Sequence, residues 1–268
     1  MAYWAESSSL KRLLFMSKRR PKSKRASKST AKHGHENIEA VPCRLFLATP
    51  TQFEVDDLTP VLENALAGGD VACVMIGHED AIKLESSAKV LTPIAQAKDV
   101  AVLIEGSIER SIEIAQKVDA DGIVVGPSID EYRQARAALG DDKIVGIDCG
   151  LDRHVAMALG EEGADFVIFD DETAEPQSVE KTDEEATQLK PDQINEPIAN
   201  WWARVFEVPC VVMAPQSGFN AIGNVKASIK SGVEFICPPN QMWESAALAK
   251  QTVCDYNQLI KETPVDEV

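Results

Sequence analysis

Eight short, nearly continuous apolar runs recur along the chain from Cys43 onward, and this repetition constrains the fold more than any other feature. Runs without polar alternation are typical of strands that are buried on both faces, and such strands belong to parallel sheets. Segments with apolar residues at helical spacing separate them. The runs occupy residues 44–48, 71–76, 100–104, 122–126, 143–147, 165–169, 209–213 and 233–237.

The junctions between these segments favour a closed barrel over an open, doubly wound sheet. Four segments, AGGDVACVMI, KVDADGIVVG, EEGADFVIF and KSGVEFIC, each leave a helix at Gly or Asp and enter a strand through a small or acidic residue. No G-x-G-x-x-G follows the first strand, which weakens the dinucleotide-binding alternative. We therefore predict an α/β chain whose residues 43–268 form a (β/α)8 TIM barrel. In its first helix, we expect Thr59 as the cap and Pro60 at the first position.

The net charge of −16 is distributed unevenly. Residues 1–42 carry a balance of +7, and the remainder carries −23. The basic segment has too few apolar residues to offset its ordering entropy, so we predict a disordered tail. It could be a solubilising tail or an arm that contacts nucleic acid or anionic lipid. An acidic barrel disfavours nucleic acid as its own partner. Met16 is an alternative start to Met1, and no oligomeric state is predicted.

A long interval separates the sixth and seventh apolar runs. Residues 170–196 contain ten acidic residues against Lys181 and Lys190. We predict an acidic loop over residues 170–200, on the rim where barrel enzymes carry their chemistry. Loops of this length are either functional lids or solvated inserts, and the charge density favours the solvated insert.

The cysteines and the hydropathy indicate where the protein resides. None of the six cysteines lies in a C-x-x-C pair, so neither a zinc site nor a redox motif is indicated. Structural, unpaired cysteines are typical of a reducing cytoplasm, and we predict a cytoplasmic protein. No run of 18 apolar residues is present, so we expect no membrane span.

Several segments together resemble one enzyme family. The stretches RLFLATP, ADGIVVG, ARAALGDDKIVGID and EGADFVIF are similar to the thiamine-phosphate synthase superfamily, which also includes a thiazole tautomerase. The resemblance covers roughly residues 44–260. It implies a barrel that condenses hydroxymethylpyrimidine pyrophosphate with thiazole phosphate, uses Mg²⁺ and releases pyrophosphate.

The residues that this condensation needs are largely replaced. A pyrophosphate leaving group requires Mg²⁺ and cationic side chains to stabilise its developing charge. The family supplies them with Gln-x-Arg-x-Lys at the second strand, where this chain has Met75–Glu79. The family's Asn-Asp after the third strand becomes Glu105–Ser107. Its Ser-x-His after the fifth becomes Asp148–Gly150, so the tautomerase base is missing as well.

Carboxylates stand at several strand ends instead. Glu105, Asp130 and Asp148 are the candidate ligands for the Mg²⁺ that the resemblance implies. Asp130 has a second interpretation, as an acid in the first turn of the following helix. The further candidates at the rim are Glu79, Asp170, Asp171 and Gln216.

A phosphate site is the part of the family pattern that is better kept. The family cradles phosphate with backbone N–H groups after the seventh and eighth strands, which need no particular side chain. Ser217, Gly218 and Asn224 match that region. Pro238 and Pro239 remove two amide donors nearby. The alternative is an ordinary turn followed by a helix cap.

Three functions are therefore open. The first is a barrel without synthase catalysis that binds a small, phosphorylated or unphosphorylated ligand. The second is an active thiamine-phosphate synthase with rewired metal ligands. The third is different chemistry on the same barrel, since fold alone does not fix function.

Overall fold

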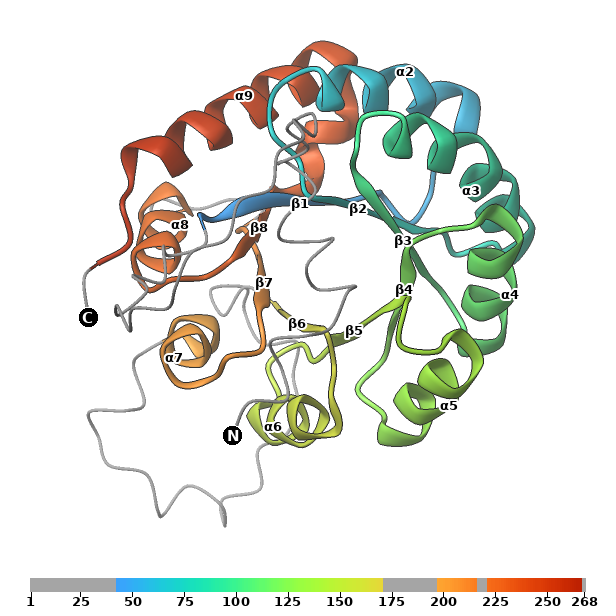
Figure 1. The fold of residues 1–268 in the computed structure, drawn as a ribbon. Helices are drawn as coiled ribbons and strands as arrows, with labels where there is room; N and C mark the ends of the chain where they lie inside the picture. Colours follow the sequence, from blue (N-terminus) through green and yellow to red (C-terminus); the bar gives the residue numbers. More distant parts are fainter. Residues whose placement is uncertain (1–41, 171–196, 216–220, 267–268) are drawn as a thin grey trace, which may run out of the picture.

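The protein is described by a computed structural model over residues 42–170, 197–215 and 221–266. Eight parallel strands form a closed barrel in sequence order, and β8 pairs with β1 to complete it. The predicted (β/α)8 barrel is thus confirmed (Figure 1). The strands are β1 (Arg44–Ala48), β2 (Cys73–Gly77), β3 (Ala101–Glu105), β4 (Gly122–Val125), β5 (Ile144–Asp148), β6 (Phe166–Phe169), β7 (Cys210–Met213) and β8 (Phe235–Cys237).

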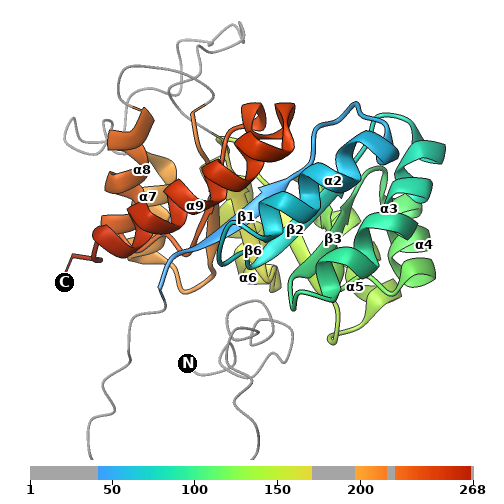
Figure 2. The same ribbon diagram turned by 90° about the horizontal axis from the view of Figure 1, so that it is seen from above.

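Helices alternate with the strands and cover the barrel on the outside (Figures 1 and 2). A short 3₁₀ helix, η3, and the long helix α9 follow the last strand. The helices are α2 (Val55–Leu66), α3 (Ala81–Gln96), α4 (Ile108–Val118), α5 (Ile129–Leu139), α6 (Arg153–Glu162), α7 (Ile198–Val205), α8 (Ala221–Lys230), η3 (Asn240–Glu244) and α9 (Ala246–Glu262). None of the helices in these described ranges is long and apolar enough to cross a membrane.

Each strand is buried on both faces, as its continuous apolar run predicts. Alternate residues fill the inside of the barrel, where the rings of Phe46 and Phe166 lie 5.7 Å apart. Gly146 leaves the space that Phe166 occupies, because a Cβ at Gly146 would lie 2.1 Å from the ring. The other face of each strand packs on the helices in a second, larger core.

The repeated helix-to-strand junction has a structural basis. The acidic residue immediately before β4, β6 and β8 accepts a backbone N–H from the start of the preceding strand. Val102 N–H donates to Asp121 (2.9 Å), Val145 N–H to Asp165 (2.8 Å) and Cys210 N–H to Glu234 (3.0 Å). At the position before β2, Ala72 replaces the acid.

The first helix begins earlier than its sequence predicts. It starts at Val55, so Thr59 and Pro60 lie inside it and the predicted cap is wrong. The Thr59 hydroxyl donates to the Val55 carbonyl (2.7 Å) rather than capping an N-terminus. Pro60 has no backbone N–H, so the carbonyl of Asp56, four residues earlier, lacks its usual helical hydrogen bond. Asp56 is exposed, so water can bind this carbonyl and the helix tolerates the proline.

The predicted acidic loop and tail fall mostly outside the described residues. Residues 198–200, which the sequence assigned to the loop, form the first turn of α7. Residues 1–41 and 171–196 are not described.

Candidate functional site

The carboxyl ends of the strands and the loops that follow them form one rim of the barrel. In (β/α)8 barrels this rim carries the functional groups, because the eight loops converge there. Six of the predicted candidates lie at or near this rim within the described residues: Glu79, Glu105, Asp130, Asp148, Asp170 and Asn224. Gln216, Ser217, Gly218 and Asp171 lie outside the described residues.

Glu105 ends β3 and points into the barrel. Side chains two apart in a strand share a face, and Ala101 and Leu103 both belong to the inner core. The carboxylate lies over Gly77, its partner on β2, where a Cβ would be only 2.7 Å from Glu105 Oε2. Gly77 therefore makes room for Glu105. Burial, together with the nearby charge of Asp148, raises the pKa of Glu105.

Asp148 occupies the equivalent place at the end of β5. Its strand alternation, after Ile144 and Gly146, also directs it to the inside. Its Oδ1 accepts the Gly150 N–H (3.1 Å), which fixes the turn after the strand. Glu105 and Asp148 thus face the same interior, and the charge of Asp148 is the second cause, after burial, of the raised pKa of Glu105.

Asp170 directly follows β6 and lies beside the turn after β5. Its backbone N–H donates to the Gly150 carbonyl (3.1 Å), and its Oδ2 lies 3.5 Å from the place of a Cβ on Gly150. Glu105, Asp148 and Asp170 are called the rim carboxylates below. Within the ranges that the structure describes, no three His, Cys, Asp or Glu side chains come close enough to form a metal-binding group.

Glu79 has a different environment. Its carboxylate accepts hydrogen bonds from Gln52 (2.7 Å) and Thr51 (3.4 Å), and its backbone N–H donates to the Thr51 carbonyl. The side chain is exposed and links the loop after β2 to the loop after β1. Its neighbour His78 does the same with the Phe53 carbonyl (3.1 Å). Glu79 is therefore engaged in holding two loops together.

Asp130 lies in the first turn of α5, on the outside of the barrel. It lines a cavity of about 570 Å³ between α5 and α6, with Arg133 and His154. Ser128 is the cap of this helix and accepts the Glu131 N–H (3.3 Å). Asp130 is therefore an acid in the first turn of a helix, which is the second of its two predicted interpretations. The structure does not bring Asp130 together with Glu105 and Asp148 into one metal-binding group.

Glu131 is a rim residue that sequence reasoning missed. Its half-buried carboxylate lies 3.5 Å from the place of a Cβ on Gly126, at the carboxyl end of β4. The signal was present as the capping-box pattern Ser-x-x-Glu at 128–131. Asn224, the remaining candidate, lies partly buried in the first turns of α8.

The described parts of the loops after the strands carry acidic side chains and no Lys or Arg. Among the described residues between the end of each strand and the next helix, none is Lys or Arg, whereas Glu54, Glu79, Asp80, Asp152 and Asp170 are acidic. Arg153 opens α6 nearby, with its guanidinium over the Trp201 ring at 5.0 Å. The described part of the rim is therefore acidic.

The thiols near the rim are not activated nucleophiles. Burial is the main cause that raises the pKa of Cys237 to about 12, and the charge of Glu105 adds to it. Burial likewise raises the pKa of Cys149 to about 12, with a contribution from Asp148. Both thiols remain protonated at neutral pH, and only the thiolate is a good nucleophile.

Comparison with known proteins points to one family. The profile of thiamine monophosphate synthase matches residues 45–239. A thiamine-phosphate synthase of Rhodospirillum centenum is 34% identical over 225 residues, which cover 82% of this chain and 98% of that protein. A thiamine-phosphate synthase of Erythrobacter litoralis is 30% identical over 207 residues, covering 76% and 89%.

Solved structures support the same fold. A thiamine phosphate pyrophosphorylase from Pyrococcus furiosus superposes with a TM-score of 0.57 at 19% identity, over 82% of this chain and 96% of that one. A (S)-3-O-geranylgeranylglyceryl phosphate synthase from Thermoplasma acidophilum gives 0.54 at 17% identity, over 82% and 94%. At these identities the likeness concerns the barrel alone.

Proposed function

The chain belongs to the thiamine monophosphate synthase family, and we propose that it is a ligand-binding member that does not form thiamine phosphate. One observation carries the proposal: the described strand ends present carboxylates and no Lys or Arg. The condensation places growing negative charge on a pyrophosphate leaving group. Carboxylates at that position raise the energy of the transition state instead of lowering it.

The residues of the rim suit the binding of a small molecule. The rim carboxylates Glu105 and Asp148 face an apolar interior whose upper layer includes Met213 and Cys237. A ring-shaped ligand would contact these apolar groups and direct its polar or positively charged atoms to the carboxylates. A phosphate on such a ligand would lie at Ser217, Gly218 and Asn224.

The Mg²⁺ that the family implies fits part of this arrangement. Mg²⁺ takes oxygen ligands, and proteins commonly hold it with one or two carboxylates while water or substrate phosphate completes the octahedron. Glu105 and Asp148 offer two such carboxylates on one interior. Glu105 and Asp148 would hold such an ion, which would supply positive charge opposite a phosphate group of the ligand.

An active synthase with rewired ligands is the second candidate. The pair of inward carboxylates favours it, because a metal ion recruited there would replace part of the missing positive charge. Growth of a thiamine auxotroph that lacks its own synthase separates the two. We expect no rescue by this chain despite soluble expression, and rescue would favour the second candidate.

Ligand binding itself is tested by thermal shift. Thiamine phosphate, thiazole phosphate and the hydroxymethylpyrimidine are added with and without Mg²⁺. We expect at least one to raise the melting temperature of the wild type, and Asp148→Asn to reduce its affinity about tenfold. Glu162→Gln, on the outer wall, is the matched control and retains the shift. Equal shifts in wild type and Asp148→Asn would contradict a role for the rim carboxylates.

We also infer a cytoplasmic location. All six cysteines are free, and five of them are buried as the strand positions predict, with Cys254 exposed. Unpaired cysteines support a reducing compartment.

A further inference from the structure

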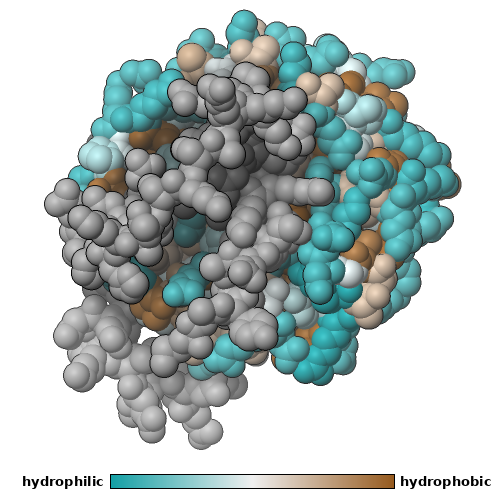
Figure 3. All heavy atoms as spheres, viewed as in Figure 1, coloured by the Kyte–Doolittle hydropathy of each residue, from teal (hydrophilic) through white to brown (hydrophobic). Residues whose placement is uncertain are grey.

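Helix α3 lies on the outer wall of the barrel between α2 and α4 (Figure 1), and most of its exposed residues are uncharged. Lys89 is the one charged residue among those of α3 that are exposed, and it pairs with Glu85 at 2.7 Å. By contrast, every exposed residue of α4 is polar. Hydrophobic patches show between hydrophilic residues on the α2–α3 side of the molecule (Figure 3). The exposed residues of α3 are Ala81, Ile82, Ser86, Lys89, Val90 and Pro93.

The uncharged residues form a stripe along the solvent side of α3. Ile82, Ser86, Val90, Pro93 and Ala97 follow one another at intervals of three or four residues, so they share one face of the helix. The side chain of Ile82 is 79% exposed and that of Val90 is 41% exposed. An exposed apolar stripe at helical spacing is typical of a surface that packs against another protein element.

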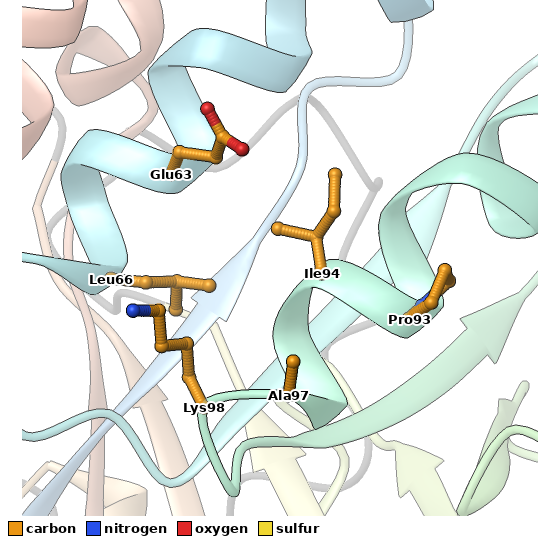
Figure 4. Close-up of a pocket in the computed structure, with 6 residues that line it drawn as sticks. All are labelled: Glu63, Leu66, Pro93, Ile94, Ala97 and Lys98. Atoms are coloured by element: carbon orange, nitrogen blue, oxygen red, sulfur yellow. The ribbon is translucent and has the colours of Figure 1, made fainter.

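A groove adjoins this stripe at one end, between the C-terminal ends of α2 and α3 (Figure 4). Its volume is about 450 Å³. Leu66 and Ile94 extend into the space between the two helices (Figure 4). Glu63 and Lys98 balance each other in charge, so the groove as a whole suits an apolar, uncharged side chain. The residues that line it are Glu63, Leu66, Pro93, Ile94, Ala97 and Lys98.

The stripe and the groove are complementary to a second copy of themselves. Ile82 protrudes at one end of the stripe and Ala97 lies at the other, about 22 Å away by the rise of an α-helix. Val90 is near the midpoint. A twofold axis there, perpendicular to α3, brings Ile82 over the partner's Ala97 and into the partner's groove, and the same contact occurs twice. Ser86 then faces the partner's Pro93, so a small residue meets a larger one at each level.

The charges of this wall do not oppose such a pairing. Within α3, Lys83 and Lys89 stand against Glu85, so this helix is not part of the acidic excess of the barrel. In the antiparallel arrangement, Lys98 approaches the partner's Asp80, the acid that caps the start of α3. Lys98 makes no ion pair with any residue in the described ranges. Opposite charges therefore meet at both ends of the paired helices.

We propose that the chain forms a twofold-symmetric dimer in which α3 packs antiparallel against α3 of a second copy. Ile82 of each subunit occupies the α2–α3 groove of the other, and Val90 lies beside the axis. The two barrels then point in opposite directions, so neither rim is covered by the partner subunit. The dimer is independent of what the rim binds.

Sedimentation equilibrium of the full-length chain between about 1 and 200 μM tests the proposal. We expect a dimer with a Kd on the order of 10 μM, because one helix and one groove per subunit form a small interface. Ile82→Ser removes both protruding side chains and should raise this Kd at least tenfold. Ile222→Ser is the matched control, because Ile222 is 64% exposed in the first turn of α8, and it should leave the Kd unchanged. A chain that stays monomeric, or a dimer that Ile82→Ser does not weaken, would overturn the proposal.

Disulfide trapping tests the antiparallel order of the two helices. Cys254→Ser removes the one exposed thiol, and the other five cysteines are buried. Ile82→Cys and Ala97→Cys are then introduced together; about 22 Å separates them within one chain, so they can form a disulfide only between subunits. The control variant carries Ile222→Cys with Ala97→Cys. We expect the covalent dimer to form at least tenfold faster with Ile82→Cys, and equal rates in the two variants would contradict this register.

Discussion

Two partly buried glutamates, Glu105 at the rim and Glu234 at the opposite end of the barrel, have raised pKa values. Glu105 is raised by burial and by Asp148. For Glu234, burial is the cause, and it raises the pKa to about 7 from 4.5 even though the carboxylate accepts the Cys210 N–H. Asp165, which occupies the same junction position before β6, has Arg136 as an ion-pair partner at 2.7 Å.

The raised pKa of Glu234 predicts stability that depends on pH. Below pH 4.5 the folded and unfolded chains both hold the proton, and between 4.5 and 7 only the folded chain does. The free energy of unfolding should therefore fall as pH rises through this window, by about 3 kcal/mol at most. Glu234→Gln should flatten the fall. Denaturant unfolding at pH 5, 6, 7 and 8 measures it, and an unchanged pH profile in the variant would contradict the assignment.

Gly77 offers a second test at the scale of one residue. A methyl group there would lie 2.7 Å from Oε2 at the movable end of the Glu105 side chain, so Gly77→Ala should displace this carboxylate and destabilise the fold by about 1 kcal/mol or less. Gly223→Ala is the control, because nothing lies within 4 Å of its Cβ position in α8, and it should be neutral or slightly stabilising. Thermal unfolding gives both values. If Glu105→Ala does not relieve the loss in the double variant, the clash is not with Glu105.

How much of the site could be predicted differs from residue to residue. Glu105 and Asp148 were identifiable because a residue that ends a buried strand must lie at the rim. The close approach of Glu105 to Gly77 was not, since it depends on the register between two strands. Asp130 was ambiguous because a strand-end acid and a helix-start acid are adjacent in sequence. Glu131 was missed because its side chain folds back over Gly126.

The strands are the elements that sequence predicts best, because burial on both faces leaves few polar residues inside the runs. The helices are predicted less well at their beginnings. The first helix starts at Val55, since Glu54, Asp56 and Asp57 suit a helix N-terminus as well as Thr59 does. The acidic loop was likewise predicted to end too late, at residue 200, because α7 begins at Ile198 directly after Pro197.

The acidic junctions should contribute strongly to the stability of the strands they join. Asp165 is 7% exposed, accepts the Val145 N–H and pairs with Arg136. Asp165→Ala leaves both donors without this acceptor and should lower the free energy of unfolding by roughly 2–4 kcal/mol. Glu162→Ala breaks only the more exposed pair with Arg133 and should cost below about 1 kcal/mol. Similar losses in the two variants would contradict a special role for the junction.

At the scale of the whole molecule, charge is separated along the chain. The first 42 residues carry +7 and the rest −23. The barrel keeps the architecture of its family, and its described strand ends carry carboxylates and no Lys or Arg. An acidic interior of this kind attracts metal ions and cationic groups and repels unneutralised phosphates. This charge distribution is the basis of the proposal that the site does not release pyrophosphate.

Formation of thiamine phosphate by the purified full-length protein tests this account most directly. Hydroxymethylpyrimidine pyrophosphate, thiazole phosphate and Mg²⁺ are supplied at saturating concentrations, with the Rhodospirillum centenum relative assayed in parallel as the positive control. We predict product from the relative and none above the no-enzyme background from this protein. Turnover by this protein that exceeds the background would contradict the central claim and would assign the missing positive charge to metal ions bound by the rim carboxylates.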